Sequence, residues 1–374
     1  MKILPKIALE RLVQALRDQG FRTAGPAERD GVVGYRWIDG TADLPWGLAD
    51  RQRPGGYGLE PGDPGRAFGC TVPTPSVKPM FLPPAEVVFR ARRTAGGLEF
   101  VASGGPAAPV ALVGIRPCDL AALHVLDRVF GGRGERAGEP EAAWARRREG
   151  TFVVVAQCTR PLATCFCADM GTGPFAATGF DIALVELEAG FAATAGTPAG
   201  RALLESLGGA EPSTAQREQV SALRRAADTA ARAPLTGAAR DVLAGRLEHP
   251  AWEAVAGRCL ACGNCTSVCP TCFCTSLAEA PEAEAGVAVR RRRWASCFET
   301  GFSYQVGGSV RRSVKSRYRQ WLRHKLCTWH DQFGTRGCVG CGRCIAWCPV
   351  GIDLRAELAA LSSRPDRQEV ENHG

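Results

Sequence analysis

The sequence is poor in several residue types and patterns that mark other classes of protein. It holds 3 methionines and 5 histidines among 374 residues, and no run of 18 apolar residues that would span a membrane as a helix. It has no GxGxxG between a strand and a helix, no GxxxxGK[ST] and no GxSxG, which excludes the usual dinucleotide, P-loop and serine-hydrolase fingerprints. Residues 1–6 lack an apolar leader region, so we expect a reducing, cytoplasmic location.

The basic side chains are almost all arginine. Lysine and arginine together number 46 against 38 acidic residues, for a net charge of +8, and arginines concentrate at 146–148, 290–293 and 311–323. No zinc-finger, helix-turn-helix or RNA-binding signature accompanies them, so nucleic acid is not an expected partner. We expect solvated helix faces or a protein docking surface, with 311–323 as the best candidate for docking.

Cysteine is the residue in excess, with 17 copies. Disulfide scaffolds are short secreted domains, whereas clustered cysteines in a long chain of a reducing compartment indicate metal ligands. Two runs, CLACGNCTSVCP and CVGCGRCIAWCP, both read C-x2-C-x2-C-x3-C-P, the ligand pattern of bacterial ferredoxins. The structural alternative, zinc, uses paired CxxC motifs.

The fourth cysteine of each run ligates the other cluster in two-cluster ferredoxins, because the two motifs are related by a pseudo-twofold. We therefore predict two [4Fe–4S] clusters with crossed fourth ligands. The first takes Cys259, Cys262, Cys265 and Cys348, and the second takes Cys338, Cys341, Cys344 and Cys269.

Four further cysteines lie in GIRPCDL and QCTRPLATCFCADMGTGP. Two of them directly follow predicted buried strands, whose carboxyl ends meet at one edge of an α/β sheet, where ligand sites form. We predict a third [4Fe–4S] cluster there, with buried inert thiols or a structural zinc as alternatives. Its ligands would be Cys118, Cys158, Cys165 and Cys167.

The remaining five cysteines lie outside these three groups. Cys272 and Cys274, in PTCFC, and Cys297, in RRWASCFE, are possible metal ligands: they would bind another cluster, replace a predicted ligand, or pack beside the clusters as free thiols. Cys70 and Cys327 are isolated, and we expect them to be buried thiols without a role.

The pattern of apolar residues predicts an α+β protein. A helix is expected over 7–19, buried strands over 110–115, 151–156 and 181–187, and helices over 199–245. This gives an N-terminal α/β domain over 1–245, a ferredoxin-like domain over 246–361 and a polar tail over 362–374. The long insertion between the two cysteine runs, with a helix expected over 310–326, resembles the all-helical dicluster ferredoxin domains of multi-subunit redox enzymes.

GIRPCDLAAL, the Cys158 to CFC stretch, CLACGNCTSVCPTCFC, RRWASCF and GCVGCGRCIAWCPVGID together resemble the β subunit of soluble group 3 [NiFe] hydrogenases, the sulfhydrogenase β subunit. The same family includes an iron–sulfur subunit of anaerobic sulfite reductase. The resemblance implies an iron–sulfur subunit, without catalytic residues, that relays single electrons between a flavoprotein subunit linked to NAD(P)H and a catalytic subunit, here a [NiFe] hydrogenase. One alternative is that the chain transfers electrons to a sulfite reductase or within another redox complex. Two others are that it is an enzyme acting at an open iron site near Cys118, or that it is a scaffold stabilised by zinc.

Overall fold

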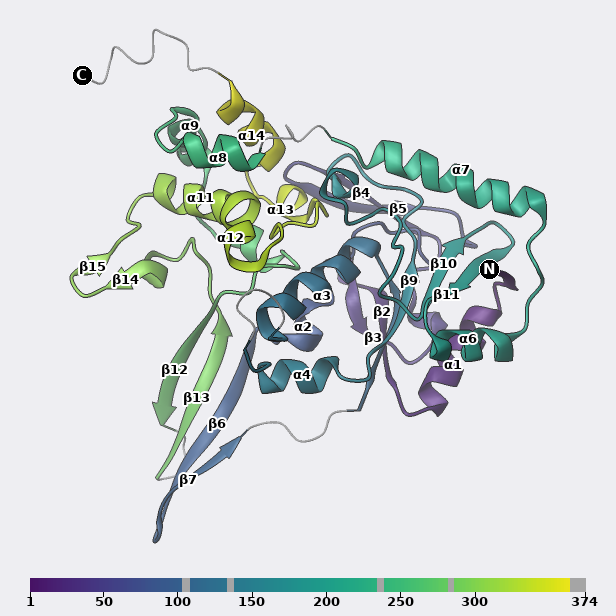
Figure 1. The fold of residues 1–374 in the computed structure, drawn as a ribbon, viewed down its shortest axis with the longest axis horizontal. Helices are drawn as coiled ribbons and strands as arrows, with labels where there is room; N and C mark the ends of the chain where they lie inside the picture. The colour runs from purple at the N-terminus through teal and green to yellow at the C-terminus, as the bar shows by residue number, and fades with distance from the viewer. Residues whose placement is uncertain (103–107, 133–137, 234–238, 282–285, 364–374) are drawn as a thin grey trace.

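A computed structural model describes residues 1–102, 108–132, 138–233, 239–281 and 286–363. Its centre is a seven-stranded sheet in the order β1-β11-β10-β9-β8-β2-β3 (Figure 1). The four middle strands, β10, β9, β8 and β2, are mutually parallel, and β1, β11 and β3 pair antiparallel at the edges. The bounds are β1 Lys2–Pro5, β2 Arg22–Arg29, β3 Val32–Trp37, β8 Val110–Ile115, β9 Phe152–Ala156, β10 Ile182–Glu186 and β11 Gly190–Ala195.

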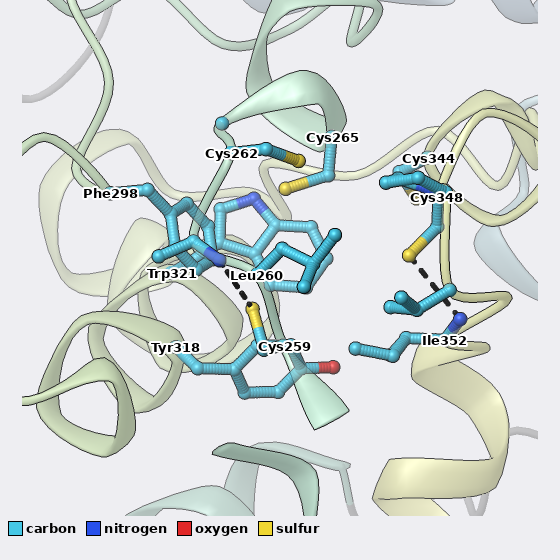
Figure 2. A pocket seen from close by; sticks show the side chains of 14 residues that line it. Cys259, Leu260, Cys262, Cys265, Phe298, Tyr318, Trp321, Cys344, Cys348 and Ile352 are labelled. Carbon is cyan, nitrogen blue, oxygen red and sulfur yellow. Dashed lines mark hydrogen bonds between the residues drawn. The ribbon is translucent and has the colours of Figure 1, made fainter. Parts of the chain in front are cut away.

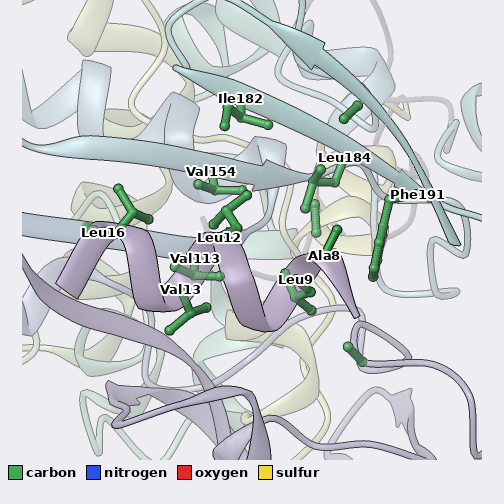
Figure 3. Packing of buried hydrophobic residues seen from close by; sticks show 14 of the residues in the cluster. Ala8, Leu9, Leu12, Val13, Leu16, Val113, Val154, Ile182, Leu184 and Phe191 are labelled. Atoms are coloured by element: carbon green, nitrogen blue, oxygen red, sulfur yellow. The ribbon is translucent and has the colours of Figure 1, made fainter. Parts of the chain in front are cut away.

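Helices cover both faces of this sheet, which explains why β8, β9 and the first four residues of β10 are continuous apolar runs without polar alternation. On one face α1 (Ala8–Asp18) presents Leu9, Leu12 and Leu16 to the strands (Figure 3). The helix α6 (Pro198–Leu207) packs beside α1. On the other face lie α3 (Pro117–Phe130), α2 (Lys78–Phe81) and α4 (Ala142–Arg148). The helix and the three buried strands predicted from the sequence are thereby confirmed.

A second hydrophobic core is built by helices from the C-terminal part of the chain. Trp252, Tyr318, Leu322 and Leu358 are buried in it, together with Leu243 from α8. Its helices are α8 (Ala239–Gly245), α9 (Ala251–Arg258), α11 (Val314–Arg323) and α14 (Leu354–Ser362). A π-helical turn, His324–Thr328, joins α11 to α12 (Trp329–Phe333), which packs in a neighbouring cluster. α7 (Thr214–Ala230) runs along the outside of the α/β half (Figure 1).

The prediction that the ferredoxin-like domain is all-helical holds only in part. β12 (Thr275–Pro281) and β13 (Val287–Trp294) form a hairpin that joins β6 (Ala85–Thr94) and β7 (Gly97–Ala102) in a four-stranded antiparallel sheet. The cause is the alternation in VAVRRRRW, which buries Val287 and Val289 on one side of β13. A register shift between Arg290 and Arg291 then brings Arg292 to a buried position. Figure 1 shows this sheet projecting from the body of the molecule.

Two small ribbons complete the fold. β4 (Leu48–Arg53) pairs with β5 (Gly56–Pro61) inside the Gly- and Pro-rich region, and β14 (Tyr304–Gln305) pairs with β15 (Gly308–Ser309). The helix expected from residue 310 begins later in the chain, because β15 occupies the residues just before it. α11 starts at Val314, after its N-cap, Ser313. No helix in the described ranges is long and apolar enough to cross a membrane. Most of the predicted polar tail lies outside the described residues.

Candidate metal centres

The first group of cysteines surrounds a pocket between the two ferredoxin motifs. Figure 2 shows Cys259, Cys262 and Cys265 from the first motif on one side and Cys348 from the second motif on the other. The chain turns tightly at Gly263, whose φ of 74° lies in the left-handed region, before the short helix α10 (Asn264–Ser267). The pocket therefore brings together the four residues predicted as ligands of the first cluster, and Cys344, predicted for the second cluster, lines it as well.

Two buried donors in this pocket fit an iron–sulfur cluster. The hydroxyl of Tyr318 and the indole N–H of Trp321 are buried, and neither finds a hydrogen-bond partner within the described part of the chain. A buried donor without a partner costs about 1–3 kcal/mol, so such groups call for an acceptor. The sulfur atoms of a cubane held by the four cysteines would supply one.

The second group lies deeper in the protein. Cys338, Cys341 and Cys269 are buried, and electrostatic interaction links Cys269 to Cys338, Cys341 and Cys344. Burial raises the pKa of the Cys338 thiol to about 11, so a bound metal would be needed to stabilise its thiolate. These are the four residues predicted for the second cluster, with α13 (Arg343–Ala346) starting after Gly342.

A buried ammonium group accompanies the second group. The Lys325 side chain, held by the π-helical turn, donates to Cys269 Sγ at 3.0 Å and lies 3.7 Å from Cys272 Sγ. Burial alone would lower the pKa of Lys325, but the surrounding thiolates outweigh burial and raise it well above its ordinary value. Lys325 was not predicted from the sequence, where it is one residue of the basic stretch RHK.

The third group gathers at the carboxyl ends of β8 and β9. Cys118 is in the first turn of α3, Cys158 follows β9, and Cys165 and Cys167 precede or begin α5 (Cys167–Met170); all four are buried. The thiol of Cys165 interacts with those of Cys158, Cys167 and Cys341, and Cys118 interacts with Cys341 and Cys167. The strand ends thus meet as predicted, and they meet the second motif as well.

Close backbone packing holds the second and third groups together. A Cβ on Gly340 would stand 2.6 Å from the carbonyl carbon of Phe166, and one on Gly342 would stand 2.4 Å from the carbonyl oxygen of Thr164. Both glycines have positive φ, 64° and 74°. Glycine is required at these two positions by conformation and by space.

Of the remaining cysteines, Cys272, Cys274 and Cys297 line a separate cavity of about 210 Å³, whereas Cys70 and Cys327 are buried apart from the three groups. The described residues include no three or more His, Cys, Asp or Glu side chains that converge on a single metal ion. A [4Fe–4S] cluster makes a different demand, because its four thiolates stand around a body of several irons.

Two arginines of the docking surface expected over 311–323 make hydrogen bonds within the chain. Arg317 donates to the carbonyl of Phe298 at 2.7 Å, and Arg323 donates to that of Leu243 at 3.0 Å. These side chains hold the helical core together. Of the other arginine runs, 290–293 lies in β13 and 146–148 in α4.

Two interleaved ferredoxin motifs around adjacent thiol groups define an iron–sulfur protein of the dicluster type. The family model described as a 4Fe-4S dicluster domain matches residues 258–352. Over 282 residues the chain is 31% identical to sulfhydrogenase 2 subunit beta of Pyrococcus furiosus, covering 74% of this chain and 79% of that protein. The chain belongs to the sulfhydrogenase β-subunit family, as its motifs predict.

Proposed function

We propose that this protein is the electron-transfer subunit of a sulfhydrogenase-like complex and carries three [4Fe–4S] clusters. It relays single electrons between a flavoprotein subunit linked to NAD(P)H and a catalytic subunit of the [NiFe] hydrogenase type. The observation that carries the proposal is the position of Cys341, which interacts with Cys269 in the second group and with Cys118, Cys165 and Cys167 in the third. Clusters bound there would be neighbours in one continuous chain.

The first group supplies the end of this chain that approaches solvent. Cys262 is exposed, and Leu260 beside it exposes 63% of its surface. This exposed part of the first group is where a partner protein would make contact. The third group is buried throughout, so an electron that enters at the first group passes inward.

Each cluster, when bound, accepts and releases one electron, and its potential depends on hydrogen bonds and burial. The protein supplies the rest. Trp321 and Tyr318 shield the first group from water and offer it donors, Lys325 donates to the second, and Trp347 stacks on Tyr57 at 5.0 Å between centroids, closing the domain contact. In this proposal these side chains hold the clusters and shield them from water, and they take no part in a chemical reaction.

The proposal is tested by anaerobic purification with iron, acid-labile sulfide and EPR analysis. We expect at least about twelve irons per chain, since each cubane holds about four, and a loss of about four in Cys158→Ala. Cys70→Ala, a matched substitution of a buried thiol outside the groups, should keep the full content. Co-purification with a flavoprotein and [NiFe] subunits supports the assigned partners. An unchanged iron content in Cys158→Ala, or hydride-dependent catalysis by the isolated chain, contradicts the proposal.

A further inference from the structure

The cavity lined by Cys272, Cys274 and Cys297 is produced by the β12–β13 hairpin. PTCFC follows the first ferredoxin motif and runs directly into β12, and β13 returns the chain so that Trp294 pairs with Thr275. The amide of Ala295 donates to the carbonyl of Cys274 at 2.9 Å, which closes the base of the hairpin. Cys274 and Cys297 therefore face one cavity, and their thiols interact electrostatically.

One buried cation lines the cavity beside its thiols. Its third thiol, Cys272, lies 3.7 Å from the ammonium of Lys325, which also lines the cavity and is 4% exposed. Outside the cavity lining, the buried Lys78 side chain donates to the carbonyl of Cys272 at 3.0 Å and fixes the backbone there. Buried cations persist where an anion pairs with them, and three thiolates on an iron–sulfur core supply such an anion.

A histidine lining the same cavity can supply a fourth ligand. His324 begins the π-helical turn and lines the same cavity, and its Nε2 lies 3.0 Å from the amide oxygen of Gln332. That oxygen accepts a hydrogen bond, so Nε2 carries the proton and Nδ1 keeps its lone pair. A ligating histidine is typically oriented in this way by a hydrogen bond to its other nitrogen. The sequence suggested an exposed histidine, but His324 is half-buried.

We propose that this cavity binds a fourth iron–sulfur cluster, with Cys272, Cys274 and Cys297 as thiolate ligands and His324 as the fourth ligand. The inference rests on the proposed function only in assigning Cys265 and Cys269 to the neighbouring clusters. Cys297 interacts with Cys265, and Cys272 is adjacent to Cys269. The fourth cluster would therefore lie beside both ferredoxin clusters, as a branch from the main chain of clusters.

The ligand set is tested by metal analysis of the full chain in its complex. We expect about sixteen irons in the native protein, a loss of about four in Cys297→Ala, and no further loss in the double variant Cys274→Ala/Cys297→Ala. Cys327→Ala, another buried thiol of the helical half, should retain every iron. Full iron and sulfide content in Cys297→Ala would overturn the proposal. It would leave the three-cluster relay intact, because that relay is tested separately by Cys158→Ala.

The histidine ligand is tested by pulsed EPR of the reduced protein. One cluster signal should show coupling to a ligand nitrogen, and the coupling should change when histidine is labelled with 15N. His324→Ala should abolish it while the g-values of the other clusters stay fixed. His330→Ala is the control, since His330 lies outside the cavity lining. Absence of nitrogen coupling in the native protein, or its persistence in His324→Ala, would overturn the assignment of His324.

Discussion

Arg343 of the second ferredoxin motif and Asp119 of α3 form an ion pair at 2.8 Å, with both side chains fully shielded from solvent. Arg343 also donates to the carbonyl of Pro73 and interacts electrostatically with Cys341 and Cys118. It therefore stands between the second and third thiol groups and ties the cluster-binding loop to the α/β sheet. A buried pair of this kind positions residues more than it adds net stability.

Removing one partner of this pair should be costly. Arg343→Met leaves the Asp119 carboxylate buried without its cation, so we expect a loss of about 3–5 kcal/mol in the free energy of unfolding. The double variant Arg343→Met/Asp119→Leu should recover much of this loss, because no uncompensated charge remains. Anaerobic denaturant unfolding of the three proteins measures the difference. A double variant no more stable than Arg343→Met would contradict this account.

Crossed fourth ligands predict a distinctive pattern of additivity. Cys348→Ala combined with Cys259→Ala should lose no more iron than either substitution alone, since both residues would bind the first cluster. Cys348→Ala combined with Cys338→Ala should lose about twice as much, because two clusters of about four irons are affected. Iron and sulfide analysis of the single and double variants decides the matter. The reverse pattern would show that each motif binds its own cluster.

The charge of Lys325 should set the potential of the second cluster. Reduction adds negative charge, which the ammonium 3.0 Å from Cys269 Sγ stabilises, so Lys325→Met should lower the potential by tens of millivolts. Lys325→Arg keeps the positive charge and should shift the potential less. An EPR-monitored redox titration provides the measurement. A raised or unchanged potential in Lys325→Met would mean that the amine is neutral in the native protein.

Glu86 should stabilise the projecting sheet in its ionised form. Partial burial would raise its pKa, but hydrogen bonds from Arg147 and Arg292 outweigh burial and lower it. A lowered folded-state pKa means that the stabilisation is complete above the ordinary pKa and is lost as pH falls through the lowered value. Glu86→Gln should thus be destabilised by the same amount from neutral pH down to about pH 5. Thermal unfolding measures the difference in stability between the native protein and Glu86→Gln at each pH. If that difference disappears above about pH 5, the ionised Glu86 is not the source of the stabilisation.

The sequence reveals those parts of the site that depend on local spacing. The C-x2-C-x2-C-x3-C-P runs predict eight cysteines in two groups, and the apolar runs that become β8 and β9 place Cys118 and Cys158 at one sheet edge. The contacts of Lys325 and Arg343 could not be predicted from local spacing, because their partners are far away in the chain. Arg292 shows the same limit: the basic run suggests a solvated surface, whereas its pairing with Glu86 makes it a buried strand residue.

The pairing of β13 with β6 joins segments from opposite halves of the chain, with Val287 opposite Arg92 and Arg293 opposite Ala85. The matched ferredoxin region, 258–352, contains β13 but not β6. A gene rearrangement that moved this region alone into another protein would expose an unpaired strand edge, a site of aggregation. Arg343 would also lose Asp119, its buried ion-pair partner. The part of the chain that must be kept together for these motifs to fold is therefore larger than the motifs themselves. It includes the α/β sheet against which they pack.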